Sequence, residues 1–230
     1  VFFMYNAFFN YFWRNVLKGK VLYEVKDNVA LLTVDNPPVN PLSDGVRTGL
    51  YESLTKAEED DSVVGVVLTG NGRAFIAGAD ISEFGGNVEG VSLNEVFQKL
   101  ENCSKPVVAA INGIALGGGL ETALCCNYRI ADNKAFVGLP EVNLGLLPGG
   151  GGTQRLPRLA GPSEALKMML TGAHVPAKKA FDMGIIDGIS DDVVNESIEF
   201  IKNKAESNED HPKVRDLNSK MIEARGDDKV

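Results

Sequence analysis

Two short apolar segments near the start of the chain predict a β-hairpin. Residues 21–25 (VLYEV) and 29–35 (VALLTVD) are both rich in strand-forming residues, and the polar residues 26–28 separate them. Two such runs joined by three turn-forming residues are typical of antiparallel strands. The second strand must end at residues 36–38 (NPP), because proline has no N–H group to donate to a β-ladder.

Two later segments are apolar without interruption. Residues 63–70 (VVGVVLTG) and 107–113 (VVAAING) are short and rich in valine. A continuous run of this length is typical of a strand that is covered on both faces. The sequence therefore predicts buried strands at both positions.

Helical periodicity accounts for much of the remaining chain. Ser43 or Asp44 is suited to cap the first helix, and the segment from Leu120 is apolar nearly all round, which indicates a buried helix. Strand–strand–helix units in succession favour an α/β fold of repeated turns, but periodicity alone does not distinguish a spiral from a doubly wound sheet. The predicted helices span residues 44–59, 92–101, 120–126, 163–170, 177–183 and 191–207.

The two ends of the chain differ from its centre. Residues 1–20 are crowded with aromatic side chains followed by basic ones, which fits a targeting leader or an interfacial segment, or else a gene-boundary artefact or fragment edge. The last 20 residues are charged and lack periodicity, so a linker or frayed end is expected there. We therefore divide the chain into an atypical leader (1–20), a core (21–190), and a C-terminal helix with a linker (191–230).

Composition narrows the classes of function. A net charge of -8 argues against general binding to nucleic acid or anionic membranes, although a local basic patch can still hold a phosphorylated ligand. No apolar run reaches the length of about 18 residues that a spanning helix requires. The three cysteines and two histidines do not have the spacing of a disulfide framework, a zinc site or a histidine-dependent triad.

Two glycine-rich segments fail as nucleotide-binding loops. Gly149–Gly152 precede Thr153-Gln154 and not the Lys-Ser/Thr pair of a phosphate loop. The glycines of residues 113–119 follow a strand and open a helix, but they lack the G-x-G-x-x-G spacing of a dinucleotide site. Neither a phosphate loop nor a Rossmann site is expected.

The glycines before the buried helix favour another kind of site. Three consecutive glycines let a ligand approach the backbone closely, and they leave unpaired N–H groups at the positive end of the helix dipole. Such amides can stabilise an oxyanion that develops on a carbonyl or thioester. Gly118 can supply one amide, and the AGAD segment (77–80), which follows a buried strand, is the candidate for the second.

Two glutamates lie in apolar surroundings near these glycines. Glu121 stands in the first turn of the buried helix, where it could simply complement the helix dipole. Burial of a carboxylate is costly, however, and raises its pKa toward the range that proton transfer requires. Glu141 is a second carboxyl group in an apolar, turn-rich stretch. Two such groups facing one pocket could hold a water molecule and pass protons, although their pairing is only suggested by this reasoning.

Three ordered motifs resemble the crotonase, or enoyl-CoA hydratase/isomerase, family. They are AFIAGADI (74–81), PVVAAINGIALGGGLETALCCNYRIA (106–131) and VGLPEVNLGLLPGGGGTQRLPRLAG (137–161), and the resemblance runs from about Val21 to Ile189. It implies an α/β fold, a spiral of repeated β-β-α turns with a C-terminal helical region. The C-terminal region looks short and divergent for a hydratase, which leaves oligomeric state and chain-length preference open.

Further details resemble one branch of that family. NPPVNPLS (36–43), the NYRIA ending of the second motif and VRDL (214–217) are similar to the hydratase part of the multifunctional β-oxidation enzymes. Those enzymes carry a dehydrogenase half downstream. The resemblance implies either a homo-oligomer or a partner half that lies outside this chain.

The resemblance also assigns roles to individual residues. It implies that the amides of Ala79 and Gly118 form the oxyanion hole and that Glu121 and Glu141 are the catalytic acid–base pair. Asp80 and Ile81 would line the coenzyme A side of the pocket. Retention of both glutamates favours hydration, because isomerases of the family commonly keep only the second.

The function implied is that of an enoyl-CoA hydratase, which adds water to trans-2-enoyl-CoA thioesters in fatty-acid β-oxidation, with Δ3,Δ2-enoyl-CoA isomerisation as a second activity. The alternatives are an enoyl-CoA isomerase only, or a CoA-ester-binding domain without turnover. No metal or redox cofactor is expected, since coenzyme A arrives with the substrate. Arg73 is either a contact for its phosphates or a solvated loop cation.

The cellular compartment stays open. The resemblance fits a peroxisomal or mitochondrial protein in a eukaryote and a cytoplasmic one in a bacterium. The last tripeptide, residues 228–230, is not a peroxisomal address of the S-K-L type.

Overall fold

The computed structural model describes residues 19–83, 90–207 and 210–226. The aromatic leader, except for its last two residues, lies outside this part of the chain. Two β-sheets form the centre of the fold. In spatial order, the larger sheet contains β1 (Lys20–Lys26), β2 (Val29–Asp35), β3 (Gly65–Gly70), β5 (Val107–Ile111), β7 (Tyr128–Asp132) and β10 (Gly188–Ser190), and the smaller one contains β4 (Ala74–Ile76), β6 (Ile114–Leu116), β8 (Phe136–Gly138) and β9 (Val175–Pro176).

The predicted hairpin is confirmed, since β1 and β2 pair antiparallel. The other neighbours in the larger sheet run parallel. Every residue of β3 and β5 is buried, as the continuous apolar runs predict. These two strands therefore form the covered middle of the sheet.

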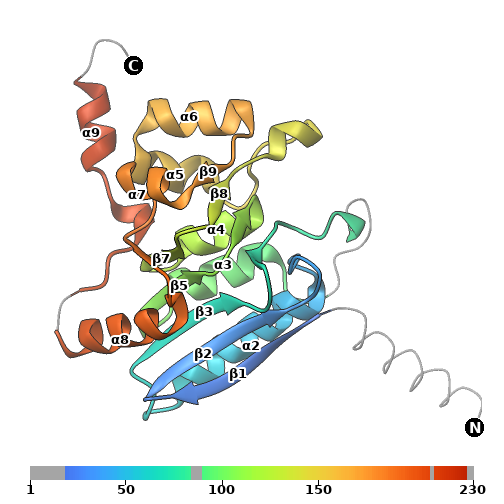
Figure 1. The fold of residues 1–230 in the computed structure, drawn as a ribbon, viewed down its shortest axis with the longest axis vertical. Coiled ribbons are helices and arrows are strands. Elements are labelled where there is room, and N and C mark those ends of the chain that lie inside the picture. The colour runs from blue at the N-terminus through green and yellow to red at the C-terminus, as the bar shows by residue number, and fades with distance from the viewer. Residues whose placement is uncertain (1–18, 84–89, 208–209, 227–230) are drawn as a thin grey trace, which may run out of the picture.

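Each turn of the chain contributes to both sheets. The larger-sheet strands β3, β5 and β7 are followed directly by the short strands β4, β6 and β8, and then by helical segments. The short strands β4, β6 and β8 pair parallel in their own sheet. The α/β fold with a spiral of repeated β-β-α turns is thus confirmed, and Figure 1 shows the turns stacking along the long axis.

The six predicted helices are present with small shifts at their ends, whereas the helices at residues 152–160 and 219–225 are not predicted by the sequence pattern. Ser43 stands at the N-cap position of α2 but makes no side-chain capping hydrogen bond, whereas Ser92 begins α3 with a complete capping box. All residues of α4 are buried, as its apolar circumference predicts. The helices are α2 (Asp44–Glu59), α3 (Leu93–Glu101), α4 (Gly118–Cys125), α5 (Gly152–Ala160), α6 (Pro162–Thr171), α7 (Ala177–Asp182), α8 (Val193–Glu206) and α9 (Ser219–Arg225), with 3-10 turns η1 (Ile81–Glu83), η2 (Glu141–Leu144) and η3 (Val214–Asp216).

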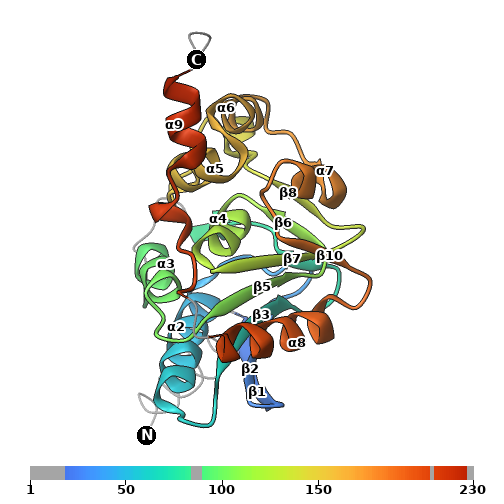
Figure 2. The ribbon, with the colours of Figure 1, turned by 90° about the vertical axis from the view of Figure 1, so that its left-hand side faces the viewer.

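The larger sheet has a different hydrophobic cluster on each face. Alternate residues of its strands, such as Val67 and Val108, pack with Ile198 and Ile201 of α8 on one face. Their neighbours in sequence join the main cluster with α2, α3 and α4 on the other face, and Figure 2 shows α8 and α4 on opposite sides of the strands. The main cluster also includes residues of α5, α6 and α7, so these helices pack on the same core as the sheets.

The expectation of a linker or frayed end after residue 210 is only partly right. Residues 214–216 form η3 and residues 219–225 form α9, which lies beside α5 (Figure 2). Hydrogen bonds to residues distant in sequence hold this stretch although its periodicity is weak. For example, Arg158 Nε donates to the carbonyl of Arg215 at 3.0 Å. Among the described residues, the helices are too short or too polar to span a membrane.

Candidate active site

A cavity of about 760 Å³ lies between the start of α4, the loop that follows β4, and η2. All six residues to which the resemblance assigns a place in the site line it, and they come from three separate segments of the chain. These residues are Ala79, Asp80, Ile81, Gly118, Glu121 and Glu141. The fold therefore brings the candidate residues together, while their roles stay predictions.

Glycine is required where α4 begins. Gly117 precedes the helix with φ at +53°, and a β-carbon on Gly119 would lie 1.9 Å from the carbonyl oxygen of Ile76. A β-carbon on Gly118 would lie 3.4 Å from the amide nitrogen of Ala79. The backbone of α4 thus packs directly against β4 and the loop after it, which larger residues would prevent.

The loop after β4 is held by backbone hydrogen bonds. The Leu42 amide donates to the Gly78 carbonyl at 2.9 Å, and Leu42 forms a parallel bridge with Ala79. The Ala77 amide donates to Val39 at 3.1 Å. Within the described part of the chain, the amides of Ala79 and Gly118 have no acceptor of their own. Two free donors on adjacent segments, at the wall of a cavity, suit the binding of a carbonyl oxygen.

Glu121 is nearly enclosed, with 4% of its surface exposed. Its Oε1 accepts hydrogen bonds from the amides of Gly150 and Gly152, both at 2.8 Å. Burial raises the pKa of Glu121, whereas these two amides and the charge of Arg155 act in the opposite direction; the pKa remains above its ordinary value. A carboxyl group that is fixed in place and has a raised pKa can accept a proton near neutral pH.

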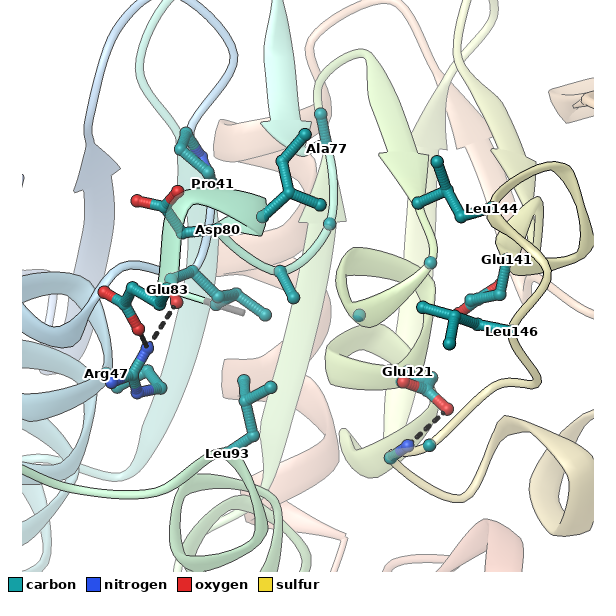
Figure 3. Close-up of a pocket in the computed structure, with 18 of the residues that line it drawn as sticks. Pro41, Arg47, Ala77, Asp80, Glu83, Leu93, Glu121, Glu141, Leu144 and Leu146 are labelled. Atoms are coloured by element: carbon teal, nitrogen blue, oxygen red, sulfur yellow. Dashed lines mark hydrogen bonds and ion pairs between the residues drawn. The ribbon is translucent and has the colours of Figure 1, made fainter. Parts of the chain in front are cut away.

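Glu141 opens η2 and is less enclosed than Glu121. Its Oε2 is buried without a hydrogen-bond partner among the described residues. Burial raises the pKa of Glu141, and the nearby charge of Glu121 raises it further. Figure 3 shows both glutamates on one side of the pocket, across from Arg47 and Glu83.

The opposite wall contains an ion pair that anchors η1. Arg47 is buried and donates to the Glu83 carboxylate at 2.6 Å and to the Leu42 carbonyl at 2.8 Å. Asp80 accepts from the Ser82 amide at 3.0 Å, so its carboxylate is committed to the turn. Arg73 is exposed and lies outside the residues that line the cavity.

Leucines form an apolar rim that the sequence analysis did not identify. Leu144, Leu146 and Leu147 of the η2 region line the cavity, with 62%, 45% and 77% of their surfaces exposed. Leu93 lines the cavity from the start of α3. An exposed apolar group of this kind marks a binding surface.

Sequence reasoning also missed the groups that hold Glu121. The glycines of residues 149–152 lack the pattern of a phosphate loop, and two of their amides bind a carboxylate of the protein itself. The signal that could have indicated this arrangement is a run of glycines in a chain that also buries a glutamate, because glycine amides can approach a carboxylate closely. The long-range pairing itself is not visible in the local pattern.

Two amides without an acceptor among the described residues, two carboxyl groups with a raised pKa and an apolar rim define a pocket suited to proton chemistry next to a carbonyl group. The chain matches the sequence profile "Enoyl-CoA hydratase/isomerase" over residues 24–225, and it belongs to this family.

The chain matches only part of the length of each of its relatives. The chain is 50% identical to the peroxisomal bifunctional enzyme of Danio rerio over 167 residues, which are 73% of this chain but only 23% of that protein. It is 45% identical to a probable enoyl-CoA hydratase of Bacillus subtilis over 165 residues, or 69% of this chain and 64% of that protein. The chain therefore spans about a quarter of the multifunctional relatives that it matches.

Solved structures share the fold. The crystal structure of an enoyl-CoA hydratase from Bacillus anthracis superposes with a TM-score of 0.76 and 36% identity, covering 82% of this chain and 77% of that one. A hydratase structure from Geobacillus kaustophilus gives a TM-score of 0.74 at the same identity.

Proposed function

We propose that this chain is an enoyl-CoA hydratase that adds water to trans-2-enoyl-CoA thioesters in fatty-acid β-oxidation. The observation that carries the proposal is that, in the described part of the chain, two carboxyl groups with a raised pKa and two amides without an acceptor meet at one cavity. The names of the relatives support the same assignment.

In the proposed reaction, the thioester oxygen accepts hydrogen bonds from the amides of Ala79 and Gly118. The oxygen of water forms a bond to C3 while the π electrons of the C2–C3 bond move toward C2 and the thioester oxygen. The two amides stabilise the enolate-like charge that develops there. This chemistry needs no metal or redox cofactor, because the amides supply the charge stabilisation.

The surroundings of the two glutamates support different roles for them. Two amides donate to Glu121, which favours its ionised form, so Glu121 is the base that takes the proton from water. Glu141 has no comparable donor on Oε2 and lies near the charge of Glu121, which favours its protonated form. Glu141 therefore delivers the proton to C2, and exchange with solvent restores both groups.

The ends of the pocket suggest where each part of the substrate lies. We assign the side of Asp80 and Ile81 to the coenzyme A portion and the leucine rim to the acyl chain, since Leu144 and Leu146 offer apolar surface beside Glu141.

The decisive experiment follows the loss of the conjugated thioester absorbance of crotonyl-CoA. Wild-type protein should turn this substrate over, and Glu141→Gln should reduce the rate by about 10²–10⁴. The control is Glu199→Gln, which changes an exposed carboxylate on α8 and should leave the rate unchanged. Near-normal turnover by Glu141→Gln would contradict the proposed role of Glu141, and no turnover by the wild type would contradict the function.

Double-bond isomerisation is a second candidate activity of the same site. The buried Oε2 of Glu141, which has no hydrogen-bond partner among the described residues, favours it, because a single group facing a 3-enoyl thioester can remove a proton at C2 and return it at C4. Rates on trans-2-enoyl and 3-enoyl thioesters, measured with one preparation, separate the two activities. A rate confined to the 3-enoyl substrate would identify an isomerase only.

A further inference from the structure

A buried ion pair lies directly behind the loop that holds Glu121. Arg155, on α5, donates from Nε to Oε1 of Glu101 at 2.9 Å and from Nη2 to Oε2 at 3.1 Å. Glu101 ends α3 and has 5% of its surface exposed. The two-point contact fixes the orientation of the guanidinium as well as its charge.

The third donor of Arg155 reaches the glutamate loop. Its Nη1 donates to the carbonyl of Gly150 at 2.9 Å. Gly150 is also one of the two residues whose amides hold Oε1 of Glu121. The guanidinium lies so close to the loop that a β-carbon on Gly151 would be 2.2 Å from Nη1. Arg155 therefore fixes the same residue that binds Glu121, from the side away from the carboxylate.

A second arginine reaches the pair from the C-terminal segment. Arg215, in η3, donates from Nη1 to Oε2 of Glu101 at 3.0 Å and from Nη2 to Oδ1 of Asn102 at 2.9 Å. Arg158 Nε binds the carbonyl of Arg215 at 3.0 Å, which ties η3 to α5. Glu101 thus accepts hydrogen bonds from two guanidinium groups that come from distant parts of the chain.

We propose that Glu101 and Arg155 position Glu121 for proton transfer through the Gly150 loop, and that Arg215 makes this positioning depend on the docked C-terminal segment. The proposal rests on the proposed function of Glu121. Glu101, Arg155 and Arg215 do not line the cavity, so they act through Glu121 without touching the substrate.

Electrostatics point in the same direction as the geometry. The positive charge of Arg155 lowers the pKa of Glu121, against the effect of burial. Loss of the three-point contact should let the loop amides turn away, which would raise the Glu121 pKa further. The expected signature is a change in the pH dependence of the site and not only a loss of stability.

The central variant is Arg155→Lys, which keeps the charge but cannot make all three contacts. We expect kcat to fall by about 10-fold, as for a loss of about 1.4 kcal/mol in transition-state stabilisation, with KM changed less than 2-fold. The acidic limb of kcat/KM should move to higher pH.

The matched control is Asp187→Asn. It breaks another ion pair of a buried arginine, Arg129, whose Nη2 lies 2.9 Å from Asp187, at a place away from the cavity. Asp187→Asn should lower Tm as Arg155→Lys does, but the acidic limb of its kcat/KM profile should stay at the same pH. Arg215→Gln removes only the exposed partner of Glu101. It should change kcat in the same direction as Arg155→Lys but by less, a fall of about 2- to 3-fold.

A second readout does not depend on turnover. The Glu121 carboxyl is titrated by NMR with ¹³C-labelled glutamate, and its signal is assigned by its loss in Glu121→Gln. A higher Glu121 pKa in Arg155→Lys, with no change in Asp187→Asn, supports the positioning role. An unchanged Glu121 titration in Arg155→Lys overturns it. Absence of hydration by the wild type instead contradicts the proposed function, so the two failures are distinguishable.

Discussion

The two glutamates of this pocket are supported in opposite ways. Glu121 belongs to α4, a helix whose residues are all buried, and two loop amides hold one of its oxygens. Glu141 belongs to η2, a turn that continues into exposed residues, and its Oε2 has no partner among the described residues. Burial raises the pKa of both groups, but only Glu121 has compensating donors from elsewhere in the fold.

This difference indicates how one pocket can contain both an acid and a base. Two identical side chains in similar surroundings would compete for one proton. Amides from another segment of the chain lower the pKa of Glu121, whereas only its own backbone lowers the pKa of Glu141, so the two groups have different surroundings. In the proposed reaction, the helix therefore supplies a fixed base, and the turn supplies an acid that faces the substrate.

The largest expected effect comes from removing both carboxyl groups. The Glu121→Gln/Glu141→Gln double variant should lose about as much activity as the more damaged single variant, about 10²–10⁴, because the two groups act as one unit. Rates on crotonyl-CoA for both single variants and the double variant give the coupling. Losses that simply multiply would show that the glutamates act independently.

A smaller loss is expected when the support of Glu121 is disturbed. In Gly150→Ala the new β-carbon would lie 2.5 Å from Oε2 of Glu121 and 2.2 Å from Phe97, so the loop must move. We expect kcat to fall by about 10–100-fold, the scale of losing one or two oriented hydrogen bonds. Gly149→Ala is the control, since a β-carbon there meets nothing within 4 Å. Equal activity of the two variants would contradict the role of the loop.

The pH dependence of activity tests which glutamate is the base. Because Glu121 must be ionised and its pKa is raised, kcat/KM should fall as the pH decreases through a value above that of an ordinary glutamate. An acidic limb at the ordinary glutamate pKa would argue against a desolvated base.

Stability should show the opposite trend with pH. A carboxyl group with a raised folded-state pKa favours folding while it is protonated, so its contribution is present at low pH and is lost as the pH rises through the folded-state pKa. Glu121→Gln should therefore lose less stability than the wild type between mildly acidic and neutral pH. Urea titrations at several pH values measure this difference, and parallel curves would contradict it.

The smallest effect is expected on the exposed side of the pocket. Leu147→Ser removes an apolar side chain that is 77% exposed, so the free energy of unfolding should change by only about 0.5 kcal/mol. KM for long-chain enoyl-CoA should rise by about 2- to 5-fold while KM for crotonyl-CoA stays constant. Leu166→Ser on α6, outside the cavity, should change neither constant. If Leu147→Ser has the same KM for long-chain enoyl-CoA as the wild type, the rim does not bind the acyl chain.

Much of the fold was predictable because local patterns carry it. The hairpin, the buried strands β3 and β5 and the buried helix α4 follow from short-range periodicity and turn residues. The choice between a spiral and a doubly wound sheet needed the family resemblance. The smaller sheet consists of strands of two or three residues, too short to leave a periodic signal.

The candidate site was predictable in part for the same reason. Glu121 and Gly118 stand three residues apart in the chain, so their relation can be seen in the sequence. The contacts of Glu121 with Gly150 and Gly152, and those of Glu101 with Arg215, join segments that only the tertiary fold brings together. Local chemistry identified which groups could react, whereas the fold determines what holds them.

The proposed oxyanion donors are main-chain atoms, and this affects how such a site can change in evolution. A point mutation at Ala79 replaces a side chain but leaves the peptide N–H in place. A one-residue deletion before the bridge between Leu42 and Ala79 would present a different amide to the cavity, because strand pairing sets the register of this loop. The lengths of the segments around residues 36–42 and 77–80 should therefore vary less among descendants of this gene than the side chains on them.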